Sequence, residues 1–133
     1  MPVEGHWRGE GDLLTKPDID FRLCIEAKKH EGWTLDGLFR EKSPIWKWWE
    51  QAELQAAKLP AHPLLLFSRN RQKTFALLRR ATACHLEVVS KHGPVLRITK
   101  KDNGYPGHTP KELVLCLLED LVSTDPKHVG RLP

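Results

Sequence analysis

The chain has 133 residues, with 21 Lys and Arg against 17 Asp and Glu and a formal net charge of +4 at pH 7. A chain of this length buries roughly two-thirds of the surface that its unfolded form exposes, so one domain held together by packing alone is expected. No window comes near the ~18 consecutive apolar residues of a membrane-spanning helix, which excludes a membrane protein. The charge is compatible with a polyanionic partner.

The first twelve residues lack the basic-then-apolar order of a secretory signal, so we expect a cytoplasmic protein. Cys24, Cys84 and Cys116 are odd in number and irregularly spaced. This pattern fits neither a disulfide framework nor a zinc knuckle, and we interpret all three as reduced packing residues.

Two strand-like segments, residues 12–15 and 21–28, flank the turn-rich residues 16–20 and predict a hairpin. In the second strand, a period of two divides the side chains between two faces. One face holds Phe21, Leu23, Ile25 and Ala27, and the other holds Arg22, Cys24, Glu26 and Lys28. We expect the first face to pack and the second to present charge.

A crossover unit follows this hairpin. Ser43 and Pro44 predict a helix start, and apolar residues then recur at three- and four-residue steps, Trp48 and Trp49 among them, until Pro60. Residues 63–67 form an apolar run typical of a strand buried on both faces. Strand, helix and strand make a βαβ unit, so strands 21–28 and 63–67 should be parallel.

The rest of the chain predicts an antiparallel strand at residues 74–78, two short strands at 85–89 and 95–99, and a loop at 101–109. A last helix is capped by Thr109 and opened by Pro110, with Leu113, Leu117, Leu118 and Leu121 on its buried side. The fold class is therefore α/β or α+β, a central mixed β-sheet flanked by helices. We expect one domain over residues 1–123 and a loose tail over 124–133.

The residues that carry chemistry are Asp12, Glu26 and Lys28. If the hairpin turn is centred near residue 19, Asp12 lies opposite Glu26 on the neighbouring strand, and Lys28 shares their face. Two opposed carboxylates repel each other unless a cation lies between them. Such a pair suits Mg²⁺ or Mn²⁺, and a nearby ammonium suits phosphodiester hydrolysis. The alternative is an ordinary solvated strand face, with Asp12 in a turn.

The part of the chain that contains Asp12, Glu26 and Lys28 resembles the PD-(D/E)XK nuclease superfamily, and within it the small phage-type and Holliday junction resolvase-like endonucleases. The resemblance rests on Gly11-Asp12-Leu13, on Ile25-Glu26-Ala27-Lys28, on the helix that contains Trp48-Trp49-Glu50-Gln51-Ala52, and on the strand 63–67. It covers about residues 9–78 and implies a restriction-endonuclease-like core. Only eleven residues precede Asp12, too few for that group's full N-terminal helix.

The resemblance implies that Asp12 and Glu26 bind the metal together with the Ala27 carbonyl, that Lys28 assists the attacking water, and that Gln51 lies beside the site. An exposed helix glutamine is the alternative for Gln51. The literal Pro17-Asp18 pair is rejected as the motif, because Asp18 falls in the predicted turn.

Basic residues and one tryptophan form a candidate DNA surface, because the predicted sheet brings them towards one side. Its members are Lys29, Trp33, Arg69, Arg71 and Lys73. An ordinary charged rim is the alternative. Trp48 and Trp49 are expected in the core instead.

Other enzyme classes find no support, since the sequence contains no zinc-type His or Cys spacing, no Walker loop and no G-x-S-x-G elbow. The leading hypothesis is a divalent-metal-dependent endonuclease for branched or structured DNA, acting as a homodimer in the cytoplasm of a bacterium or phage-infected host. Two alternatives stay open. One is a non-catalytic DNA-binding or scaffolding protein on a degenerate nuclease fold, and the other is a protein adaptor that uses exposed tryptophans.

Overall fold

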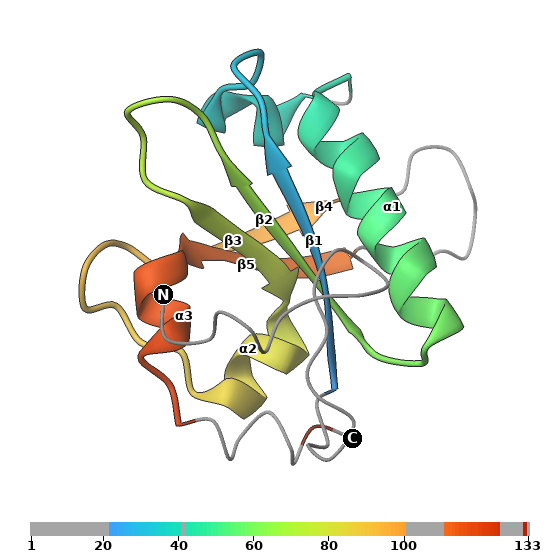
Figure 1. The fold of residues 1–133 in the computed structure, drawn as a ribbon. Helices are drawn as coiled ribbons and strands as arrows, with labels where there is room; N and C mark the ends of the chain where they lie inside the picture. Colours follow the sequence, from blue (N-terminus) through green and yellow to red (C-terminus); the bar gives the residue numbers. More distant parts are fainter. Residues whose placement is uncertain (1–21, 41, 101–110, 126–131, 133) are drawn as a thin grey trace.

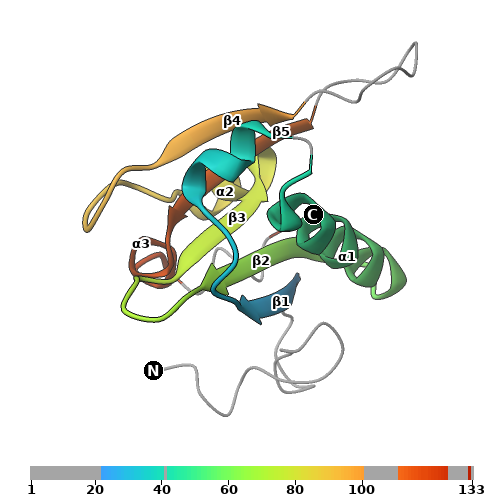
Figure 2. The ribbon, with the colours of Figure 1, turned by 90° about the horizontal axis from the view of Figure 1, so that it is seen from above.

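A computed structural model describes residues 22–40, 42–100, 111–125 and 132. Within these residues, five strands form one mixed sheet in the order β1-β2-β3-β5-β4 (Figure 2). The strands are β1 (Leu23–Lys29), β2 (His62–Ser68), β3 (Phe75–Arg79), β4 (Leu96–Lys100) and β5 (Lys111–Leu117). The helices are the 3-10 helix η1 (Leu35–Phe39), α1 (Pro44–Lys58), α2 (Arg80–Leu86) and α3 (Leu118–Val122). The expected mixed sheet flanked by helices is confirmed.

The βαβ unit is also confirmed. Ser43 caps α1, since its side-chain oxygen accepts a hydrogen bond from the Ile45 N–H at 3.3 Å, and Pro44 is the first helical residue. β1 and β2 are parallel, with Glu26 opposite Leu65 and Lys28 opposite Phe67. α1 lies along both strands (Figure 1).

β3 pairs antiparallel with β2, and β4 begins at Leu96, so both strands agree with the sequence-based expectation. The strand expected at residues 85–89 is wrong. Residues Arg80–Leu86 form α2, which ends at Glu87 in the left-handed conformation with φ 57°. Ala83 and Leu86 are three residues apart and both are buried. This spacing places them on one face of a helix, whereas a strand would alternate buried and exposed residues.

The long last helix is the second wrong prediction. Lys111–Leu117 form β5, which pairs with both β3 and β4, and the helix α3 covers only Leu118–Val122. Residues 113–117 are all buried. A continuous apolar run is typical of a strand that is covered on both faces, and its leucine spacing also fits a helix face, which explains the error.

The core is divided by the sheet into two clusters. α1 and η1 cover one face, where all the described tryptophans lie: Trp33, Trp46, Trp48 and Trp49. This confirms Trp48 and Trp49 as core residues. α2 and α3 cover the other face, and the core cluster on that face includes Leu23 and Ile25 of β1.

Several expectations fall outside the described residues: the strand 12–15 with Asp12, the turn 16–20, the loop 101–109, and Pro110. Leu132, expected in a loose tail, is instead buried in the cluster beneath α2 and α3. Cys24 and Cys116 are buried packing residues as expected, whereas Cys84 is exposed, which corrects the prediction for that thiol.

Candidate active site

Alternate residues of β1 form a stripe that faces α1. Leu65 and Phe67, which lie opposite Glu26 and Lys28, belong to the core cluster on the α1 side, while Ile25 belongs to the other cluster. The predicted division of β1 into two faces is therefore confirmed. The exposure of the side chains rises along the stripe: Cys24 is fully buried, and the side chains of Glu26 and Lys28 are 12% and 27% exposed.

Glu26 and Lys28 form the charged pair of this stripe. The Lys28 Nζ lies 3.6 Å from a Glu26 carboxylate oxygen. Both groups are shielded by the neighbouring helix yet still reach solvent, so each can contact a ligand that approaches the end of β1. In such a partly shielded place, charge interactions are stronger than on an open surface.

The Ala27 carbonyl has a defined direction. The Arg22 carbonyl accepts from the His62 N–H at 2.7 Å, and the His30 N–H donates to the Ser68 carbonyl at 3.0 Å. In a parallel ladder, alternate residues bond to the same neighbour, so the even-numbered residues of β1 turn their backbone groups towards β2. The Ala27 carbonyl therefore points to the outer side of β1.

Gln51 and Asp12 are the other two predicted catalytic residues. Gln51 is exposed on α1. Its place beside the site stays a prediction. Asp12 lies outside the described residues, so the expected pairing of Asp12 with Glu26 is untested.

Two loops meet at the end of β1, where the β1–η1 connection, the β2–β3 turn and the start of α1 gather (Figure 1). The Arg69 guanidinium donates to the Trp33 carbonyl at 2.8 Å and lies 5.0 Å from the Trp33 ring centroid. The Asn70 N–H donates to the Glu31 carboxylate at 2.7 Å. These contacts fix the β2–β3 turn next to the site.

Sequence reasoning missed the Glu31–Asn70 contact and the bracing role of Arg69. The signal was available in the predicted βαβ register, because parallel strands end at the same edge and bring residues after 28 beside residues after 67. Only the identity of the hydrogen-bond partners needed coordinates.

The candidate DNA residues occupy different environments. Lys29 is exposed at the last position of β1, and Arg71 is exposed in the turn with φ 62°. Lys73 forms an ion pair with Glu119 at 2.8 Å, and its hydrogen bond is the main cause that lowers the pKa of Glu119. Lys29 and Arg71 are thus the more accessible cations, while Arg69 is largely engaged by the Trp33 loop.

Trp33 requires a correction. Its side chain is 2% exposed, its indole N–H donates to the Ser68 carbonyl at 3.1 Å, and its ring packs edge-on against Phe67 and Phe75. A ring that is enclosed in this way has no face available for stacking on a base. Trp33 is a core residue of the α1 side and not a nucleic-acid contact.

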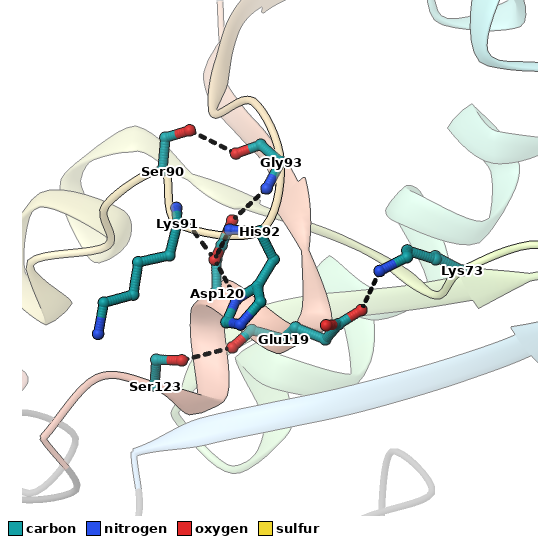
Figure 3. Close-up of polar contacts among 8 residues, drawn as sticks. All are labelled: Lys73, Ser90, Lys91, His92, Gly93, Glu119, Asp120 and Ser123. Carbon is teal, nitrogen blue, oxygen red and sulfur yellow. Dashed lines mark hydrogen bonds and ion pairs between the residues drawn. The ribbon is translucent and has the colours of Figure 1, made fainter.

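A second charged cluster lies elsewhere, around Asp120 of α3 (Figure 3). The residue is 1% exposed, and its carboxylate accepts hydrogen bonds from the backbone N–H groups of Lys91, His92 and Gly93 at 3.2, 2.8 and 3.2 Å. The His92 Nδ1 lies 2.9 Å away. Burial acts to raise the pKa of Asp120, but these hydrogen bonds outweigh it and the pKa is lowered.

Comparison with protein families identifies the chain. A family model described as "Phage putative PDDEXK endonuclease" matches residues 4–130. The chain belongs to this family. Neither the curated proteins nor the solved structures contain a significant match.

Membership of this family confirms the resemblance to phage-type nucleases of the PD-(D/E)XK superfamily, and the mixed sheet agrees with a restriction-endonuclease-like fold. A nuclease family implies DNA as substrate, and nucleases of this superfamily generally use divalent metal ions. Among the residues that the structure describes, every helix is too short or too polar to cross a membrane.

Proposed function

We propose that this protein is a Mg²⁺- or Mn²⁺-dependent endodeoxyribonuclease that hydrolyses phosphodiester bonds in branched DNA, as Holliday junction resolvase-like enzymes do. The observation that carries the proposal is the Glu26–Lys28 pair, 3.6 Å apart and partly exposed at the end of β1. The same end of the sheet bears the exposed cations Lys29 and Arg71.

The donors on β1 suit a hard divalent ion. The Glu26 carboxylate and the Ala27 carbonyl are oxygen ligands of the kind that Mg²⁺ prefers. Within the described ranges, no three His, Cys, Asp or Glu side chains gather closely enough to hold a metal. In our proposal Glu26 and Ala27 supply part of the ligand set, and Asp12 completes it.

The roles of the side chains follow from their charges. A divalent ion, when bound, supplies Lewis acidity to the phosphate. Glu26 holds the Lys28 ammonium in place through their ion pair, and Lys28 stabilises the negative charge that develops on the phosphate and orients the attacking water. Gln51 is proposed to contact the substrate from α1.

The decisive experiment measures cleavage of a labelled four-way junction and of linear duplex DNA with Mg²⁺. Glu26→Gln and Lys28→Met are expected to lower kcat by about 10²–10³-fold each, as the loss of one preorganised charge does. Glu112→Gln and Lys58→Met are matched controls on exposed positions and should cleave normally. Equal cleavage by all five proteins would contradict the proposal. Salt-sensitive binding of the junction without cleavage would favour the non-catalytic alternative.

A homodimer with two sites related by a two-fold axis would cut a junction symmetrically, and this state belongs to the proposal. Sedimentation equilibrium with and without junction DNA tests it, and a monomer under both conditions would contradict it. The adaptor alternative loses support, because the described tryptophans, which it requires to be exposed, are all buried.

A further inference from the structure

His30 continues the stripe of Glu26 and Lys28 that faces α1. Its backbone N–H donates to the Ser68 carbonyl at 3.0 Å, which extends the β1–β2 ladder by one step past the last strand residue. Because side chains alternate along an extended chain, His30 shares a face with Glu26 and Lys28. The stripe therefore presents a carboxylate, an ammonium and an imidazole in a row.

The ring of His30 is positioned by α1. Its centroid lies 5.2 Å from the Trp48 ring, with the two planes tilted by 43°. Trp48 is itself buried, whereas His30 is exposed. The imidazole is thus supported by a rigid indole on one side and reaches solvent on the other, which is the arrangement of a preorganised ligand contact.

The charges around His30 favour an anion. Lys28 and Lys29 precede it, and the following Glu31 turns its carboxylate to the Asn70 N–H in the β2–β3 turn. Two residues along a strand span about 7 Å, so His30 and Lys28 can serve neighbouring phosphates of one DNA strand.

We propose that His30 donates a hydrogen bond to the DNA phosphate next to the one that Lys28 stabilises, and so positions the strand in the site. This inference rests on the proposed function and adds to it a substrate-contacting residue that the PD-(D/E)XK motif does not contain. The role is binding and positioning, so its loss affects DNA affinity and KM more than kcat.

The test compares His30→Ala, His30→Gln and His30→Arg with His85→Ala, an exposed histidine of α2 on the opposite face of the sheet. Binding of a four-way junction is measured with Ca²⁺ in place of Mg²⁺, and cleavage is measured with Mg²⁺. We expect about five- to tenfold weaker binding for His30→Ala, a smaller loss for His30→Gln, and recovery with His30→Arg. His85→Ala should bind normally.

A readout that is independent of activity is the NMR signal of the His30 ring, assigned with His30→Gln. Adding junction DNA with Ca²⁺ should shift this signal and leave that of His85 in place. Melting curves of the His30 variants verify that each is folded, and His30→Gln remains the decisive variant if His30→Ala does not fold.

Normal junction binding by His30→Ala or His30→Gln, with Glu26→Gln and Lys28→Met inactive, overturns this inference and leaves the proposed function in place. If Glu26→Gln and Lys28→Met cleave normally, the proposed function fails first and the inference fails with it.

Discussion

Glu26 and Asp120 are two shielded carboxylates in very different surroundings. Asp120 has no exposed side-chain surface and receives three backbone N–H bonds and a histidine ring. Glu26 is 12% exposed, and its ammonium partner stands at 3.6 Å, beyond ordinary hydrogen-bond distance. The two acids differ in enclosure: Asp120 is surrounded by donors inside the fold, and Glu26 lies at the border of the core next to an ammonium group.

The largest expected difference between these acids is in stability. Asp120→Ala leaves the N–H groups of residues 91–93 without their acceptor and releases their loop from α3. We expect a fall in melting temperature of about 5–10 °C, measured by circular dichroism. Glu26→Gln, which keeps the shape of the side chain, should melt close to the wild type. If the two variants melt alike, the distinction between the two acids fails.

The surroundings of Glu26 could be predicted from the sequence, whereas those of Asp120 could not. Alternation placed Glu26 and Lys28 on one face of β1, and the Ser43-Pro44 cap and the apolar run at 63–67 placed α1 and β2, because these signals are local. The Asp120 cluster joins residues 27 to 29 positions apart, and no local pattern signals such a contact. Trp33 was misplaced for the same reason, since its burial depends on Phe67 and Phe75 from other strands.

The next largest expected effect is a rise in melting temperature on metal binding, which should depend on Glu26. Mn²⁺ that binds the folded protein and not the unfolded chain stabilises it by RT ln(1 + [Mn²⁺]/Kd), or about 2.7 kcal/mol at 100 times Kd. We expect millimolar Mn²⁺ to raise the melting temperature of the wild type by a few degrees, and Glu26→Gln to lose this shift. Glu112→Gln, the matched exposed control, should retain it. A shift that persists in Glu26→Gln would place the ion elsewhere.

A smaller effect concerns pH. The native pKa of Asp120 lies below its ordinary value of 3.8, because the hydrogen bonds to its carboxylate outweigh burial. The stabilisation is therefore fully present above about pH 5, well above the unfolded pKa, and is lost progressively as the pH falls through 3.8 towards the native pKa. Urea unfolding of the wild type and Asp120→Asn from pH 7 to pH 3 measures this. The advantage of the wild type should begin to shrink below about pH 5, and an advantage that grows between pH 5 and pH 3 would contradict the assignment.

The smallest effect is in thiol reactivity near the same acid. Burial, followed by the charge of Asp120, raises the pKa of Cys116 to about 12, so this thiol stays protonated at neutral pH, and Cys24 is buried as well. Cys84 is exposed on α2. Because the thiolate is the reacting form, a disulfide reagent at pH 8 should modify one thiol quickly, and Cys84→Ser should remove that fast phase without changing the melting temperature. Urea at a concentration that unfolds the chain should then expose the other two thiols. Rapid reaction of Cys116 in the native protein would mean that the cluster beneath α2 and α3 opens readily, and the enclosure of Asp120 would not be the rigid feature that its hydrogen bonds indicate.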